Sequence, residues 1–375
     1  MIYLDHASTT PLDGEVLSVM MPYLTTDFGN ASSQHSLGRA SANAVIAARD
    51  CIANIMGVPA RNLYFTSGGT EACNTAIKGV AYANADRGKH LVISAIEHHA
   101  MLSAASDLQR HGFTVTLVKP DGNGVISARA IAEAITPQTA FVGVMSANNE
   151  VGTVQPVADI YAVCKERGVF FFCDCVQTAG VLDFKQFPAD GIAFSAHKFY
   201  GPKGFGGLYM GGNARFERLI AGGEQERGLR GGTTFTAGAV GCAYALKKAY
   251  DNAAANNARV ARLRDLFVKQ VLGGIEGTHL NGDKKLRLPA NANISFDGRD
   301  GEQILFGLDL RGIAVSTGSA CSSGAVNPSH VLTAMGLPEE RVRGAVRFTF
   351  GKNNTEDEVI KTVAELKSVV AKIRG

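Results

Sequence analysis

Up to residue 210, hydrophobic residues come in short continuous runs separated by segments with helical periodicity. The runs predict strands at 2–4, 63–65, 91–94, 113–118, 141–145, 169–172, 191–194 and 208–210. The intervening segments predict helices at 13–23, before 57, from 67 through 81, and at 128–135 and 157–167. Continuous rather than alternating apolar runs are typical of a parallel sheet covered by helices on both faces. We therefore predict an α/β fold with a mostly parallel sheet.

From residue 237 the rhythm becomes α+β. Two helices, at 237–255 and 258–272, precede shorter strands and helices, and the chain ends in an amphipathic helix that opens on the capping box Thr355 to Glu358. We predict a large domain over 13–245, and a small domain made of 1–12 and 246–375.

Polar residues directly follow five of the predicted strands. They are Ser67 to Glu71, Glu97-His98, Asn148-Asn149, Asp174 and His197-Lys198. Ligands of open α/β sheets bind outside the carboxyl ends of the strands. These residues are therefore expected to share one site.

Composition narrows the class of protein. The 375 residues are 46% hydrophobic and 19% charged, with a net charge of +3, so no direct nucleic-acid binding is expected. No apolar run reaches the roughly 20 residues of a membrane span, and the N-terminus lacks a signal peptide, which predicts a cytoplasmic protein. The seven cysteines are scattered without a CxxC pair, which predicts reduced thiols and no metal site.

Lys198 ends a predicted strand and enters the glycine-rich turn 201–207. Backbone can surround such a lysine, and desolvation lowers the pKa of an amine toward the range that imine formation needs. The alternative is a surface turn with solvated lysines. Likewise, the turn at Ser67 to Glu71 is either a phosphate cradle at a helix N-terminus or only a structural cap.

Asp174 closes a phenylalanine-rich strand, where a buried acid needs a partner. That partner is either a protonated heterocyclic nitrogen or an arginine. Strand alternation puts Asp174 and Val176 on one face, with Cys173 and Cys175 on the other. His98 either takes part in catalysis, by stacking on a flat ring or by shuttling protons, or is simply packed. Together with an imine-forming lysine and a phosphate cradle, these residues point to pyridoxal 5′-phosphate.

Two further residues complete the set. Cys321 lies in a loop of small residues, 316–324, without the bulky apolar neighbours of a core cysteine, which favours a nucleophilic role. Arg347 is a single cation in an apolar strand. It either clamps a substrate carboxylate or forms a structural salt bridge.

These residues together resemble the cysteine desulfurases of the NifS/IscS-like type, in the class V aminotransferase family of pyridoxal-phosphate enzymes. The resemblance covers the chain almost end to end. Its most specific motifs are the lysine turn at Ser195 to Gly204 and the Gly-Ser-Ala-Cys loop at Gly318 to Gly324. It implies a pyridoxal-phosphate transferase of fold type I, with a seven-stranded large domain and a smaller α+β domain that carries the catalytic cysteine.

The resemblance also implies a role for each site residue. It assigns the cofactor to Gly69, Thr70, His98, Asn149, Asp174, Gln177, Ser195, His197, Lys198 and Thr233. Of these, Lys198 is the Schiff-base lysine, Asp174 meets the ring nitrogen and His98 stacks on the ring. Thr233 reaches in from the other subunit of a homodimer. Asn149 and Arg347 hold the substrate carboxylate.

The implied reaction converts L-cysteine to L-alanine and leaves the sulfur on Cys321 as a persulfide. A sulfur-acceptor protein, for example an iron–sulfur scaffold, then takes the sulfur. The family usually has His where Phe172 stands and Ala where Cys175 stands, a difference that can mark a branch serving DNA or tRNA sulfur modification. A class V aminotransferase, a selenocysteine lyase and a non-catalytic sulfur-carrier scaffold remain alternatives.

Overall fold

The fold was analysed in a computed structural model of the chain, which describes residues 1–318 and 328–373. Its main sheet has seven strands among the described residues, in the order β2-β8-β7-β6-β5-β3-β4. From one edge to the other they are β2 (Leu63–Thr66), β8 (Gly206–Met210), β7 (Gly191–Ser195), β6 (Phe170–Asp174), β5 (Thr139–Gly143), β3 (His90–Ser94) and β4 (Thr114–Val118). Only β8 among them is antiparallel to its neighbours, so the other carboxyl ends share one edge. The predicted α/β class and the mostly parallel sheet are confirmed.

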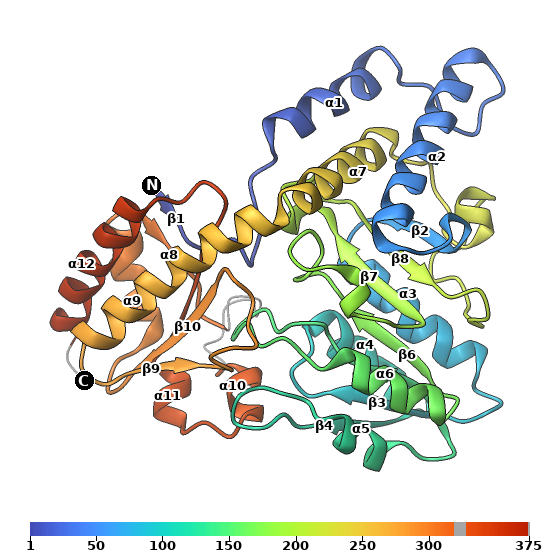
Figure 1. Cartoon of the computed structure of the whole chain (residues 1–375). Coiled ribbons are helices and arrows are strands. Elements are labelled where there is room, and N and C mark those ends of the chain that lie inside the picture. Colours follow the sequence, from blue (N-terminus) through green and yellow to red (C-terminus); the bar gives the residue numbers. More distant parts are fainter. Residues whose placement is uncertain (319–327, 374–375) are drawn as a thin grey trace.

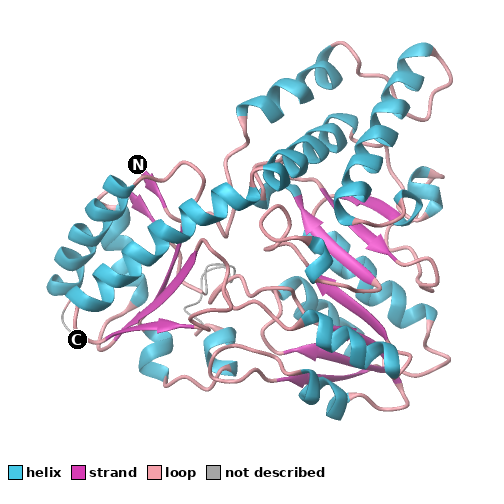
Figure 2. Cartoon of the chain, in the orientation of Figure 1, coloured by secondary structure: helices cyan, strands magenta, loops and turns pink. Residues whose placement is uncertain are grey.

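Helices cover both faces of this sheet, as Figures 1 and 2 show. They are α1 (Gly14–Thr25), α2 (Ser36–Met56), α3 (Gly69–Ala83), α4 (His99–Arg110), α5 (Ala128–Ala134), α6 (Val157–Glu166) and α7 (Thr236–Asp251). Alternate residues of β6 point to opposite faces of the main sheet. Phe171 and Cys173 pack with α2, α6 and α7 on one face, whereas Phe172 packs with α3 and α4 on the other. Because both faces are buried, the strands need continuous apolar runs.

A second core lies beyond α7. Its antiparallel sheet has β10 (Asn291–Phe296) between β12 (Ala345–Thr349) and β9 (Thr278–Asn281), and β1 (Ile2–Tyr3) pairs with β11 (Ile313–Ala314). The helices here are α8 (Ala253–Gly274), α9 (Gly301–Asp309) and α12 (Glu356–Lys372). The short helices α10 (His330–Ala334) and α11 (Glu339–Arg343) bury Val331, Leu332 and Val342 against the first core instead. In Figure 1, α7 and α8 form a nearly continuous rod between the two cores, with Asn252 at the junction. The domain limits given above remain a prediction.

Most elements match the sequence pattern, and the differences have local causes. The predicted capping box of α12 is present, with Thr355 and Glu358 bonding each other's backbone N–H. β5 ends two residues before the predicted strand, although Val144 still donates to the carbonyl of Phe172. α4, β9 and α11 were not predicted. β9 and α11 are short. α4 has 12 residues and buries Ala100, Met101, Ala104 and Leu108 at helical spacing, so its pattern was present in the sequence and was missed. No helix of the described residues has the length and apolarity needed to cross a membrane.

Candidate active site

Lys198 lies in the short turn that follows β7. Its Nζ donates to the carbonyl oxygens of Ala7, at 2.5 Å, and Ser8, at 2.8 Å. The turn doubles back closely, since a Cβ on Gly201 would lie 2.9 Å from the carbonyl oxygen of Ala196. The lysine is half-buried and surrounded by backbone, in contrast to the solvated surface turn that the sequence left open.

The segment 5–10, which we call the N-terminal segment, connects the lysine to its neighbours. Besides Lys198, the carbonyl of Ala7 accepts from Gln177 Nε2 at 3.1 Å, and Thr9 Oγ1 bonds His197 Nδ1 at 3.0 Å. The sequence analysis gave this segment no role. Its polar residues also follow a predicted strand, so the rule applied to the main sheet could have found it.

Asp174, at the end of β6, is 5% exposed. Its Oδ1 accepts from the backbone N–H of Val176 at 2.9 Å, and its Oδ2 accepts from Cys73 Sγ at 3.5 Å. Burial raises the pKa of Asp174, while the Val176 N–H, His98, Cys73 and Lys198 act in the opposite direction. No arginine pairs with this carboxylate among the described residues, so it is suited to a cationic ligand group.

His98 caps the N-terminus of α4. Its Nδ1 accepts from the backbone N–H of Ala100 at 3.1 Å, which leaves the proton on Nε2. Burial lowers the pKa of His98, and the charge of Lys198 lowers it further, whereas Asp174 acts to raise it. The imidazole is therefore neutral at pH 7, and it lies in the field of both Asp174 and Lys198.

The turn between β2 and α3, where a phosphate cradle is predicted, packs closely around its glycines. Gly68 has φ of 147°, and a Cβ on Gly69 would lie 2.7 Å from Val176 Cγ2, so only glycine fits here. The atom nearest to a Cβ placed on Gly68 would be Ser195 Oγ, at 3.5 Å. Thr70 is exposed at the same helix N-terminus. The N-terminus of α3, with its helix dipole and the nearby Ser195 hydroxyl, suits a phosphate.

Arg347 lies in β12, at the edge of the second core. Its Nη2 donates to Asp5 Oδ1 at 2.8 Å and to Ser8 Oγ at 2.7 Å, and its Nη1 donates to the carbonyl of Asn149 at 2.9 Å. The structural salt bridge that the sequence left open is thus present. Its buried Nε–H has no partner among the described residues.

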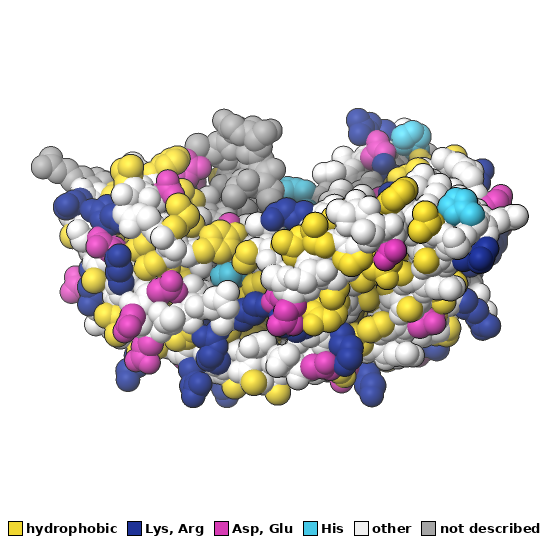
Figure 3. Space-filling model, turned by 90° about the horizontal axis from the view of Figure 1, so that it is seen from above, with side chains coloured by type: hydrophobic (Ala, Val, Ile, Leu, Met, Phe, Trp, Pro, Cys, Tyr) yellow, Lys and Arg dark blue, Asp and Glu magenta, His cyan; other side chains and the backbone are white. Residues whose placement is uncertain are grey.

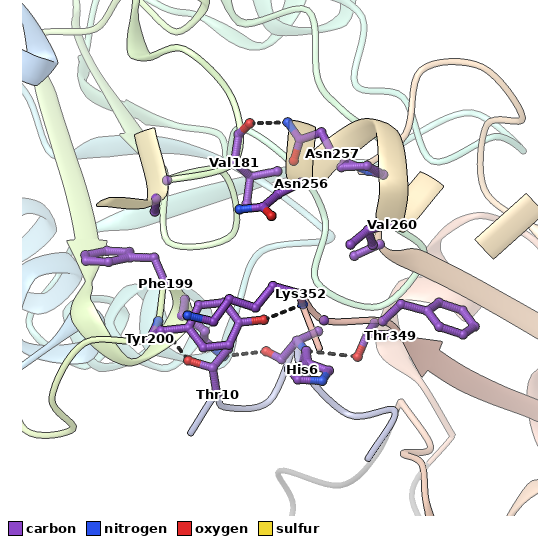
Figure 4. Close-up of a pocket in the computed structure, with 18 of the residues that line it drawn as sticks. His6, Thr10, Val181, Phe199, Tyr200, Asn256, Asn257, Val260, Thr349 and Lys352 are labelled. Carbon is purple, nitrogen blue, oxygen red and sulfur yellow. Dashed lines mark hydrogen bonds between the residues drawn. The ribbon is translucent and has the colours of Figure 1, made fainter. Parts of the chain in front are cut away.

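A cavity of about 330 Å³ borders Lys198 and Gln177. Figure 4 shows its walls, which come from the N-terminal segment, α8 and both cores. Tyr200 forms part of the wall, and its hydroxyl accepts from the backbone N–H of Lys352 at 2.9 Å. The lysine therefore lies at the junction of the two cores.

A lysine, a buried acid and a glycine cradle at one sheet edge describe a site but do not by themselves specify a family. The model for class V aminotransferases matches residues 2–361. The chain belongs to the class V aminotransferase family. Within it, the cysteine desulfurase IscS of Clostridium botulinum is 42% identical over 377 residues, covering 100% of this chain and 95% of the relative.

The chain is also similar to solved structures. One described as a NifS-like protein superposes with a TM-score of 0.92 at 33% identity, covering 99% of each chain. Another, described as SspA in complex with cysteine, has a TM-score of 0.83 at 33% identity, covering 95% of this chain and all of the other. The resemblance drawn from the motifs and the predicted fold class are both confirmed.

For two residues that the family resemblance singles out, the role stays a prediction. Cys321 lies outside the described residues. Thr233 is exposed on the single chain, and its contribution to a neighbouring subunit stays a prediction. The predicted alternation of β6 is confirmed, because Cys173 and Cys175 lie on the face of the main sheet opposite to Asp174, with their Sγ atoms 3.6 Å apart.

Three buried residues near the site were given no individual role by the sequence analysis. Cys73 contacts Asp174, as described above. Burial, with the nearby charge of Asp174, raises the pKa of Glu97 to about 8, and burial raises that of Glu150 to about 7. Glu97 and Glu150 adjoin predicted site residues in the chain, but nothing in the sequence shows that their own side chains are buried.

Proposed function

We propose that this protein is a cysteine desulfurase, which converts L-cysteine to L-alanine and transfers the sulfur to Cys321 as a persulfide. The observation that carries the proposal is the meeting of Lys198 and the buried Asp174 at one sheet edge, in a chain whose full-length relative is named a cysteine desulfurase. A structural relative described in complex with cysteine adds support for the substrate.

The residues at this edge fit pyridoxal 5′-phosphate. Gly69 and Ser195 suit its phosphate, and Thr70 and His197 lie beside them in the chain. Asp174 would meet the ring nitrogen, because a protonated ring supplies the cation that a buried carboxylate needs. His98 would stack on the ring, and Gln177 would bond the ring oxygen. When bound, the cofactor supplies an electron sink for charge that develops at the substrate Cα.

The protein's own groups then orient the substrate. Arg347 would bind its carboxylate through the Nε–H that has no partner among the described residues, while Asp5 and Ser8 hold the rest of the guanidinium in place. Asn149, whose carbonyl already accepts from Arg347, is the second carboxylate ligand. The amine of Lys198 takes the proton from the substrate Cα.

Sulfur transfer is assigned to Cys321. Its thiolate forms a bond to the substrate sulfur as the C–S bond breaks, and the electron pair of that bond remains on the carbon skeleton, which gains protons to become alanine. The persulfide is the sulfur donor for an acceptor protein, such as an iron–sulfur scaffold.

The protein is further proposed to be a homodimer. Four apolar side chains of α1 and the following turn are more than a third exposed: Leu17, Met21, Leu24 and Phe28. The face that carries α1 and α2 shows many hydrophobic side chains between scattered charges (Figure 3). An apolar face of this kind suits a second copy of the chain, which would also bring in Thr233.

Incubation of the holoenzyme with L-cysteine and a reducing thiol tests the proposal, with alanine and sulfide measured together. Equal amounts of alanine and sulfide are expected. Pyruvate or a requirement for a keto acid would instead indicate an aminotransferase. Faster turnover of L-selenocysteine in competition would indicate a selenocysteine lyase.

Two variants locate the chemistry. Lys198→Ala should lose the borohydride-reducible cofactor, which also excludes a non-catalytic sulfur-carrier scaffold. Cys321→Ser should bind cofactor and L-cysteine but form almost no alanine and no protein persulfide. Cys51→Ser removes a half-buried thiol of α2 and is the control, which should match the unmodified enzyme. Alanine formation at the full rate by Cys321→Ser would contradict the assignment.

A further inference from the structure

The two oxygens of Asp174 have unequal partners. Oδ1 accepts a backbone N–H, from Val176, at 2.9 Å. Oδ2 accepts only the thiol of Cys73, at 3.5 Å, among the described residues. A thiol is a weak donor, so Oδ2 retains most of its capacity to accept another hydrogen.

Among the described residues, no strong donor side chain of β6 or α3 bonds Oδ2. Cys73, in α3, is 0% exposed. Phe172 lies two residues before Asp174 on the same face of β6 and belongs to the same apolar cluster as Cys73. Its ring stacks on Phe141 with centroids 5.9 Å apart. This is the position at which the family usually has a histidine, which could donate to a neighbouring carboxylate.

We infer that Cys73 is a positioning residue that acts through Asp174: it fills the space beside Oδ2 without supplying a strong donor, and so leaves the carboxylate strongly basic toward the ring nitrogen of the cofactor. Phe172 contributes by closing the same side to stronger donors. The inference rests on the proposed function, since it requires pyridoxal phosphate to bind here.

The physical basis is the effect of hydrogen bonds on a carboxylate. Each strong donor stabilises the charged form and lowers its affinity for another proton, whereas burial raises that affinity. With one backbone donor and one thiol, Asp174 keeps a high affinity for a proton shared with a ring nitrogen. A hydroxyl at position 73 would be a stronger donor to Oδ2 and would weaken this interaction.

Replacing Cys73 by serine and by alanine separates this role from simple packing. Packing predicts that Cys73→Ala is the worse variant, because alanine leaves a void where serine nearly fills the volume. The donor argument predicts the opposite order. Cys242→Ser and Cys242→Ala are the matched controls, because Cys242 is also 0% exposed in a helix, α7, and does not contact Asp174.

The experiment loads each protein with pyridoxal phosphate labelled with ¹⁵N in the ring. The ¹⁵N chemical shift reports ring protonation, and titration of the apoprotein gives the cofactor dissociation constant. We expect Cys73→Ser to shift the resonance toward unprotonated pyridine and to weaken cofactor binding about three- to tenfold. Cys73→Ala should keep the pyridinium resonance and bind within about twofold of the unmodified protein.

The outcomes are distinguishable. Loss of protonation in Cys73→Ala equal to or greater than that in Cys73→Ser would overturn the inference, as would identical spectra for all proteins. If Cys73→Ser fails to fold, Cys73→Thr takes its place as the hydroxyl variant, with the same expected result and the same result that would overturn the inference. Failure of the unmodified protein to form a borohydride-reducible imine on Lys198 would instead reject the proposed function.

Discussion

Replacing Glu150 by glutamine should change the pH dependence of stability. Glu150 is 3% exposed and accepts from Ser329 Oγ at 2.5 Å. Burial raises the pKa of its carboxyl from the ordinary 4.5 to about 7, although Ser329, Arg347 and His99 act to lower it. Its carboxylate also lies against Gly318, so Glu150 lies beside residues 318 and 329, on either side of the segment that contains Cys321.

The sign follows from where the proton is bound. Below pH 4.5 the carboxyl is protonated in both states. As the pH rises toward 7, the unfolded chain releases the proton while the folded protein keeps it, so the free energy of unfolding falls. A pKa raised from 4.5 to about 7 corresponds to a loss of about 3 kcal/mol, complete above pH 7. Glutamine is neutral throughout, can still accept from Ser329 and lacks this loss.

Urea unfolding, followed by circular dichroism at one protein concentration from pH 4.5 to 8.5, measures the effect. The Glu150→Gln variant should gain about 3 kcal/mol relative to the unmodified protein between the two ends of the range. The control is Glu133→Gln, whose side chain is 64% exposed, and its curve should run parallel to that of the unmodified protein. A parallel curve for Glu150→Gln as well would refute the argument.

Three further predictions concern the site. Asp174→Asn should bind cofactor but lose at least about 100-fold in turnover, because an amide cannot hold the ring proton as a carboxylate does; turnover close to normal would reduce Asp174 to a structural role. Arg347→Lys should lower kcat/KM for L-cysteine about 100-fold, since an ammonium group cannot reproduce the three hydrogen bonds of the guanidinium, and an unchanged kcat/KM would argue against a carboxylate clamp. Cys175→Ala should keep turnover within about tenfold of the unmodified enzyme, because its Sγ lies beside Cys173 on the face of the main sheet away from Asp174. A larger loss would give this thiol a place in the mechanism.

Much of the fold and the list of candidate site residues could be predicted from the sequence. Hydrophobic periodicity depends only on which residues must be buried, so it predicted the buried strands and the edge of the sheet where polar residues gather. The motif at Lys198 predicted the cofactor chemistry, because an imine needs a particular residue type. Where the sequence offered alternatives, as between a clamp and a salt bridge for Arg347, local pattern had no means of choosing.

Tertiary structure decided which groups meet across the chain. Asp5 and Arg347 are 342 residues apart and form an ion pair, and Cys73 reaches Asp174 over 101 residues. The burial of Glu97 and Glu150, and hence their raised pKa values, likewise depends on elements packed around them. Such contacts produce no periodic pattern in the sequence, because each one joins a single pair of residues that are distant in the chain and become neighbours only when the protein folds. The sequence by itself determined the chemistry that is available, and the packing of the two cores decided how those groups are paired.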